Sequence, residues 1–225
     1  MGKNKLRKFA ETKTFENMIQ EPRPDLLEDD LPMKGKWHKS FFKNDHPIVL
    51  ELGCGKGEYT IGLAEKFPHK NFIGVDIKGA RMWRGAKTAT VNRMSNVGFL
   101  RTQIELIDHC FSQGEVSEIW ITFPDPQIKY RRRKKRLTAP DMLAIYRKVL
   151  TDDALLHLKT DSQFLHGYTL GMLEGNSHKI LETSYDIDRQ RPNDDLLGIR
   201  TNYEGIFRRQ GVPITYIKFQ LSEQI

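Results

Sequence analysis

Short apolar runs alternate along the chain with segments whose apolar residues recur at helical spacing. The apolar runs predict five strands, at residues 48–52, 72–76, 97–100, 118–123 and 154–158. The periodic segments predict helices at residues 58–67, 79–94, 104–111, 138–149 and 163–174. Two later runs, at 180–185 and 214–221, predict an antiparallel pair of strands. Strict alternation of this kind requires a mostly parallel α/β sheet with helices on both faces, and ligands then bind beyond the carboxyl ends of the strands.

The ends of two predicted helices carry residues suited to capping. Thr138 is expected to be the N-cap of the helix at 138–149, with Pro140 and Asp141 in its first turn, where both are favoured. Asp161 stands just before the segment that begins at Ser162, so one interpretation of Asp161 is an N-cap for the helix at 163–174.

The first 35 residues differ in composition from the rest of the chain. They contain a basic start (3–8), an acidic cluster (28–30) and the helix-interrupting Pro22, Pro24 and Pro32. Such a segment is expected to stay mobile or to become ordered only on a partner such as RNA. We therefore divide the chain into an N-terminal extension, residues 1–35, and one folded domain, residues 36–225.

The composition also narrows the class of protein. No apolar run approaches the roughly 20 residues that span a bilayer, and the N-terminus lacks the apolar segment of a secretory signal. Cys54 and Cys110 offer neither a disulfide framework nor metal-ligand spacing, and the seven histidines are scattered. We therefore expect no membrane partner, no bound metal and a reducing cytoplasm as the compartment.

The positive charge of the chain is concentrated in one place. There are 36 Lys and Arg against 29 Asp and Glu, and seven of the eight residues at 129–136 are cations, so the rest of the chain is electroneutral. Affinity of a polyanion held there would fall steeply with salt. The run directly follows Phe123-Pro124-Asp125-Pro126 at the end of a predicted strand, which favours a clamp beside a reactive site. The alternative is a solvated charge run or a nuclear-import signal.

A glycine-rich loop follows the first predicted strand. Gly53, Gly55 and Gly57 allow backbone to approach a ligand, but Glu58 stands where a dinucleotide fingerprint has its third glycine. Glu51 beside the loop would repel a pyrophosphate and could bind an amino group. Asp76, which ends the next strand, is placed to accept hydrogen bonds from ribose hydroxyls. These features fit S-adenosylmethionine better than a dinucleotide; the alternative is a tight turn without a ligand.

Four motifs together resemble a known family. They are Glu51–Gly57, Phe123–Pro126 with the basic run, Thr160–Asp161, and Thr201–Glu204 with Phe207 and Gly211. From about residue 35 to residue 219, the chain resembles the tRNA (guanine-N7-)-methyltransferases of the bacterial single-subunit type. The resemblance implies a class I S-adenosylmethionine-dependent methyltransferase (Rossmann-like) fold with a seven-stranded sheet. It also implies methylation of a variable-loop guanosine at position 46 of tRNA, with no obligatory protein partner evident.

The resemblance also implies roles for the matching residues. The methyl donor would be bound by Glu51, Gly53, Gly55, Gly57, Asp76, Gln103 and Asp125. Asp125 would lie between donor and guanine and holds the family's catalytic position. The RNA would be contacted by Lys129, by Arg131, Arg132 and Arg133 of the basic run, and by Asp161, Thr201, Asn202, Tyr203 and Glu204. Two positions depart from the family pattern, since Gln103 aligns loosely near the adenine and Gln127 replaces a tryptophan after Pro-Asp-Pro.

The expected chemistry needs few protein groups. Guanine N7 carries a lone pair outside the aromatic sextet, so it can attack a sulfonium methyl group without first losing a proton. Catalysis then reduces to alignment and to stabilising the cation that develops on the purine. Asp125 is the first candidate for that task and Asp161 the second. Two other functions stay open from the sequence: a non-catalytic RNA-binding protein, and a nucleotide-cofactor oxidoreductase.

Overall fold

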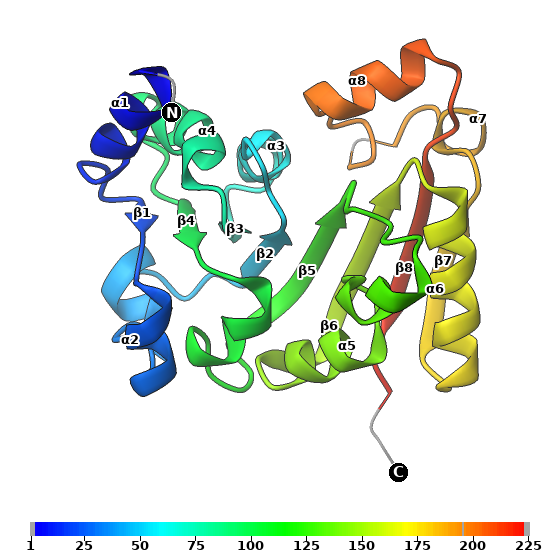
Figure 1. Ribbon diagram of the computed structural model, residues 1–225, viewed down its shortest axis with the longest axis horizontal. Helices are drawn as coiled ribbons and strands as arrows, with labels where there is room; N and C mark the ends of the chain where they lie inside the picture. Colours follow the sequence, from blue (N-terminus) through cyan, green and yellow to red (C-terminus); the bar gives the residue numbers. More distant parts are fainter. Residues whose placement is uncertain (1–2, 195, 223–225) are drawn as a thin grey trace.

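The computed structural model of the protein describes residues 3–194 and 196–222. Its centre is one eight-stranded sheet in the order β1-β4-β3-β2-β5-β6-β8-β7, covered by helices on both faces (Figure 1). In chain order the strands are β1 (Met18–Ile19), β2 (Ile48–Leu52), β3 (Asn71–Asp76), β4 (Val97–Arg101), β5 (Val116–Thr122), β6 (Leu150–Thr160), β7 (Lys179–Ser184) and β8 (Thr215–Gln220). β8 runs antiparallel to both of its neighbours, β6 and β7, while the pairs formed among β1 to β6 are parallel. The mostly parallel α/β sheet and its terminal antiparallel pair are therefore confirmed.

The helices follow the predicted order, with several additions. The α-helices are α1 (Lys3–Thr12), α2 (Arg23–Glu28), α3 (Glu58–Lys66), α4 (Gly79–Val91), α5 (Pro140–Arg147), α6 (Gln163–Gly175), α7 (Ile187–Gln190) and α8 (Asn202–Arg209). A π-helix, η1 (Trp37–Phe42), and two 3-10 helices, η2 (Ile104–His109) and η3 (Tyr130–Lys135), complete the elements. Within the described residues, none of these helices has the length and apolar character needed to cross a membrane.

The sheet has eight strands because the N-terminal segment adds one. β1 pairs in parallel with β4, with Met18 opposite Phe99, and the amide of Phe99 donates to the carbonyl oxygen of Asn17 at 2.8 Å. The expected count of seven is therefore corrected to eight. The difference arises because β1 is only two residues long and carries no alternating pattern that sequence periodicity could detect.

The segment expected to be mobile packs against the sheet in this structure. α1 lies against α4, where Glu11 accepts hydrogen bonds from Trp83 Nε1 and Lys87 Nζ, both at 2.8 Å. Leu26 and Leu31 are buried in the same apolar cluster as the central strands. A few apolar side chains therefore hold residues 3–35 on the domain despite their polar composition. The domain boundary at residue 35 remains a prediction.

Alternate residues of the central strands point to opposite faces, as the pleat requires. Ile48 and Leu50 of β2 belong to one apolar cluster with Leu143 of α5 and Leu165 of α6. Val49 belongs to a second cluster, together with Leu63 of α3, Ala86 of α4 and Phe99 of β4. These two clusters bury both faces of the sheet.

The connections create a switch point at the middle of the sheet. From β2 the chain moves outward through β3 and β4 on one side, then returns to β5 and β6 on the other. The loops after β2 and β5 therefore diverge at the carboxyl edge, which is where ligands bind in sheets of this kind. α8 lies above the same edge (Figure 1).

One capping prediction is wrong, and one alternative capping interpretation is excluded. α5 begins at Pro140 with Ala139 as its N-cap, while Thr138 is buried and its hydroxyl lies 2.8 Å from the hydroxyl of Thr169. The N-cap of α6 is Ser162, whose hydroxyl accepts from the amide of Leu165 at 3.2 Å. The N-cap interpretation of Asp161 is thus excluded, and its carboxyl group is left for another role.

Candidate active site

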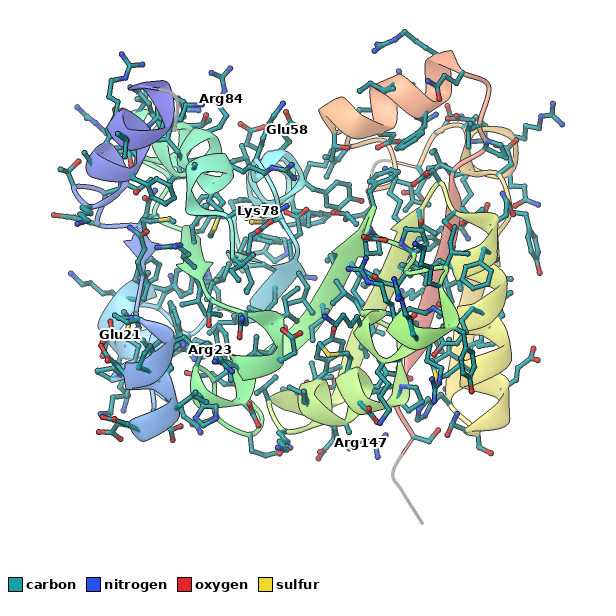
Figure 2. All side chains as sticks on the ribbon, viewed as in Figure 1. Glu21, Arg23, Glu58, Lys78, Arg84 and Arg147 are labelled. Atoms are coloured by element: carbon teal, nitrogen blue, oxygen red, sulfur yellow. The ribbon has the colours of Figure 1, made fainter. Side chains whose placement is uncertain are left out.

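A cleft of about 360 Å³ opens at the switch point. Its walls come from the loops after β2, β3, β5 and β6 and from the segment that starts α8. The lining residues are Glu51, Gly53, Cys54, Gly55, Lys56, Glu58, Asp76, Arg81, Thr122, Phe123, Pro124, Asp125, Pro126, Asp161, Thr201 and Phe207. Figure 2 shows Glu58 and Lys78 near this edge and Arg147 at the opposite end of the sheet. The fold therefore brings together carboxylates that are far apart in the sequence.

The glycine loop offers open backbone to the cleft. Gly53 and Gly55 have φ of 77° and 56°, in the left-handed region that favours glycine. A Cβ added to Gly53 would meet no atom within 4 Å, so the space above this backbone is free for a ligand. Gly57 serves packing instead, since an added Cβ would lie 2.5 Å from the Phe99 ring. Gly57 does not line the cleft, and its donor-binding role stays a prediction.

Glu51 is a buried carboxyl group at the back of the cleft. Only 3% of the residue is exposed, and burial raises its pKa to about 7, although the hydrogen bonds it accepts oppose the shift. One oxygen accepts from both the amide and the hydroxyl of Thr60, and the other accepts from the hydroxyl of Thr122 at 2.7 Å. The oxygen that accepts from Thr122 has a second lone pair, so Glu51 can still accept from a ligand.

Asp76 ties the glycine loop to the start of α4. One carboxylate oxygen accepts from the amide of Gly55 at 2.9 Å, and the other accepts from the amide of Lys78 at 2.7 Å. Asp76 lines the cleft and is only partly buried. It is therefore held in a fixed position with lone pairs still available to hydroxyl donors.

Asp125 projects from a strained turn after β5. Phe123 and Gln127, which flank the Pro-Asp-Pro sequence, have φ of 48° and 46°, values that cost non-glycine residues about 1–3 kcal/mol. The amide of Phe123 donates to the backbone carbonyl oxygen of Lys159 in β6 at 2.8 Å, and the amide of Gln127 donates to Asp125 Oδ1 at 3.0 Å. Asp125 itself is exposed. Strain held by surrounding contacts is typical of functional sites.

Asp161 follows β6 on the same edge. It is half-buried, and this burial raises the pKa of its carboxyl group. Asp161 and Asp125 both line the cleft, so the structure brings the two catalytic candidates to one space. Gln103 lies at the end of β4, outside the lining residues, and its contact with a donor stays a prediction.

The basic run forms an exposed rim next to the Asp125 loop. Lys129 and the residues of η3 are exposed, including Arg131, Arg132 and Arg133. One of the cations, Lys134, forms a loose surface pair with Asp141 at 3.6 Å. These positive charges are therefore available to a bound polyanion.

The segment Thr201–Glu204 closes one side of the cleft. Thr201 lines it and caps α8, accepting from the amide of Glu204 at 3.2 Å. The side chains of Asn202 and Tyr203 lie outside the described residues. Glu204 is fully buried and accepts from Lys159 at 2.9 Å and from Arg208 at 2.6 Å. In this conformation the side chain of Glu204 is buried, and its expected contact with RNA stays a prediction.

Lys159 is a site residue that the apolar pattern of β6 conceals. Its side chain is 0% exposed, and its ammonium group donates to the carbonyl oxygens of Leu197 at 2.8 Å and Ile199 at 3.0 Å as well as to Glu204. Burial lowers the pKa of Lys159 to about 8, against the opposing effect of Glu204. Lys159 does not itself line the cleft. Among the residues that do, Arg81 and Thr122 have no role in the predictions from the sequence, because neither stands in a pattern that indicates a site.

Metal ligands are not assembled anywhere in the described part of the chain. No group of three or more His, Cys, Asp or Glu side chains there could hold an ion.

Known proteins similar to this chain are methyltransferases. The model of a family described as putative methyltransferases matches residues 45–217. The tRNA (guanine-N(7)-)-methyltransferase of Christiangramia forsetii is 59% identical, with 98% of this chain and 99% of the relative covered. Proteins of the same name from Bacteroides fragilis and Levilactobacillus brevis are 51% and 34% identical, covering 100% and 83% of this chain and 88% and 85% of the relatives.

Solved structures share the fold at low sequence identity. The 16S rRNA methyltransferase KamB matches with a TM-score of 0.63 at 14% identity, covering 82% of this chain and 92% of that one. The geranyl diphosphate C-methyltransferase of Streptomyces coelicolor matches with a TM-score of 0.52 at 14% identity, covering 83% and 74%. The expected class I S-adenosylmethionine-dependent methyltransferase fold is thereby confirmed.

Proposed function

This chain belongs to the tRNA (guanine-N7-)-methyltransferase family, and we propose that its cleft is where that family's reaction takes place. The enzyme transfers a methyl group from S-adenosylmethionine to N7 of a guanine in tRNA. For the target we propose the variable-loop guanosine at position 46. We further propose that the chain acts without an obligatory protein partner, in the cytoplasm.

The observation that carries the proposal is the meeting of Glu51, Asp76 and Asp125 in one cleft beside open glycine backbone. A carboxylate at Glu51 suits the ammonium group of an amino-acid moiety, and Asp76 suits ribose hydroxyls. The donor set therefore fits S-adenosylmethionine, which supplies an activated methyl group on a sulfonium sulfur when bound. Gln103 is proposed to contact the adenine.

Asp125 is proposed to orient the guanine. The N1–H and the exocyclic amine of guanine are donors, so a carboxylate can hold that edge while N7 faces the cleft. The same negative charge stabilises the cation that develops on the purine. Asp161 is the alternative for this role, because it lines the same cleft. In either case the carboxylate acts by position and charge, since no proton must be removed.

The exposed basic run is proposed to bind the tRNA backbone. Lys129, Arg131, Arg132 and Arg133 lie on the rim next to Asp125, where phosphates can displace counterions. Thr201, Asn202 and Tyr203 are proposed to contact the RNA from the other side. Glu204 is proposed to act indirectly, by holding this segment through Lys159.

Methyl transfer followed by site-specific scission tests the function. Unmodified tRNA is incubated with the enzyme and labelled S-adenosylmethionine, then cleaved by chemistry specific to N7-methylguanosine. We expect label in the tRNA and a single cut at position 46. Absence of label would favour a non-catalytic RNA-binding protein, and a cut elsewhere would refute the proposed position. Equilibrium binding of NAD, expected to be absent, serves as the control against an oxidoreductase.

A further inference from the structure

Arg136 ends the basic run but differs from the cations before it. Its residue is only 6% exposed, whereas Lys129 and the five cations of η3 are exposed. The guanidinium group lies over two rings of α6, at 4.8 Å from the centroid of Phe164 and 4.2 Å from that of Tyr168. Guanidinium groups stack favourably on aromatic faces, so Arg136 is held by packing as well as by charge.

The donors of Arg136 point at the loop that carries Asp125. Its Nε donates to the carbonyl oxygen of Pro126 at 3.3 Å, and its Nη2 donates to that of Gln127 at 3.2 Å. Gln127 has a positive φ, and its amide donates to Asp125 Oδ1. A chain of contacts therefore runs from α6 through Arg136 to the backbone after Asp125.

The backbone of Arg136 is fixed as well. Its amide donates to the carbonyl oxygen of Arg133 at 3.3 Å, and its carbonyl oxygen accepts from the amide of Ala139 at 2.9 Å. The residue thus stands at the junction of η3 and α5. Three elements meet there: the run, α6 and the strained turn after β5.

We propose that Arg136 is a positioning residue that fixes the Asp125 loop, while the exposed cations of the same run bind tRNA. A planar guanidinium can donate to two carbonyl oxygens while its flat face stacks on aromatic rings, whereas a lysine ammonium group has no flat face to stack. Loss of this anchor frees the turn to relax, and misplacement of a catalytic group by about 1 Å can lower a rate by roughly 10²-fold. The inference rests on the proposed role of Asp125.

The test compares Arg136→Ala with Arg133→Ala, which removes an exposed cation from the same run. Single-turnover rates at saturating tRNA and donor are measured with the salt dependence of tRNA binding. We expect Arg136→Ala to lose roughly 10–10²-fold in rate with an unchanged salt slope. Arg133→Ala is expected to lower the slope by about 0.7–0.9. Arg147→Gln, at the opposite end of the sheet, is the matched control and is expected to keep both the rate and the slope. A flattened slope with a wild-type saturating rate in Arg136→Ala would overturn the proposal.

Two further measurements separate positioning from general damage. Added guanidinium is expected to restore part of the rate of Arg136→Ala, and it should not restore that of Asp125→Asn. Arg136→Lys keeps the charge and is expected to bind tRNA normally with a reduced rate, so a wild-type rate in this variant would contradict the proposal even if Arg136→Ala fails to fold.

Hydrogen exchange at the Gln127 amide gives a readout that does not depend on the reaction. This amide is bonded to Asp125, and its protection should fall in both Arg136 variants but not in Arg133→Ala. Unchanged protection of the Gln127 amide would show that Arg136 does not fix the Asp125 loop, whatever reaction the enzyme performs. If the wild-type protein is inactive but the Arg136 variants lose protection as expected, the proposed role of Asp125 is refuted. The contact by which Arg136 fixes the loop is then still supported.

Discussion

Two charged regions border the cleft, and their surroundings differ. η3 and Lys129 hold exposed cations, whereas Lys159 and Glu204 form a buried ion pair that the partly buried Arg208 extends. Exposed charges keep their hydration and are available to a polyanion. Buried charges lose it and must find partners inside the protein. The exposed cations are therefore available to bind RNA, whereas the buried charged groups stabilise the fold. The degree of burial decides which of the two roles a charged side chain has.

The largest effect is expected from breaking the buried network. Lys159→Met leaves Glu204 buried without its ammonium partner, which costs roughly 3–5 kcal/mol of unfolding free energy, near the lower end because Arg208 remains. Denaturant unfolding measures this loss. The double variant Lys159→Met/Glu204→Met should recover most of it, since apolar groups can replace a buried pair. A loss of unfolding free energy below about 1 kcal/mol would contradict this expectation, because it would equal the contribution of a weak, exposed ion pair.

Substitution of Asp76 in the donor-binding part of the cleft is expected to have a smaller effect in free energy than breaking the buried network. Asp76→Ala should weaken S-adenosylmethionine binding by roughly 1–3 kcal/mol, the range for removing charge-assisted hydrogen bonds. Calorimetric titration measures it. Asp76→Asn keeps the shape and some acceptor capacity and serves as the matched control with a smaller loss. Unchanged donor affinity in folded Asp76→Ala protein would remove Asp76 from the site.

Glu51 predicts a pH dependence of donor binding. Its pKa of about 7 in the folded protein lies above its usual 4.5, so its contribution to stability is complete below 4.5 and is lost as pH rises through 7. A bound ammonium group favours the ionised carboxylate instead. Donor affinity should therefore fall below pH 7, by up to about tenfold per unit. Glu51→Gln should abolish this dependence, and its persistence there would assign the titration to another group.

The exposed run is expected to show the smallest effect per residue. Replacing Arg131, Arg132 and Arg133 with Gln should flatten the salt dependence of tRNA binding by about 0.7–0.9 log units for each phosphate that the protein no longer neutralises. Arg147→Gln, at the opposite end of the sheet (Figure 2), is the control and should leave the slope unchanged. An unaltered slope in the triple variant would mean that the run is only a solvated face.

Periodicity and strand ends made much of the site predictable. The strands that frame the cleft have strong apolar runs, and Glu51, Asp76, Asp125 and Asp161 stand at or just after their ends, where parallel sheets assemble ligand sites. These signals are local, so they can be recognised without knowledge of the packing.

Burial of individual polar residues could not be predicted in the same way. Lys159 lies in a strand where a charged residue normally points outward, and Arg136 is one of seven cations that look equivalent in the sequence. The packing of Leu26 and Leu31 depends on a complementary apolar surface formed by distant strands. Each outcome depends on long-range contacts rather than on neighbours in the sequence.

The most direct test of the division between chemistry and binding is a single-turnover measurement at saturating tRNA and donor. Asp125→Asn should lose about 10²–10³-fold in rate with tRNA affinity nearly intact, as expected for removal of one preorganised electrostatic group. The triple variant of Arg131, Arg132 and Arg133 should keep the wild-type rate once tRNA is saturating. A wild-type rate in Asp125→Asn would move the role to Asp161, and a reduced rate in the triple variant would contradict the division itself.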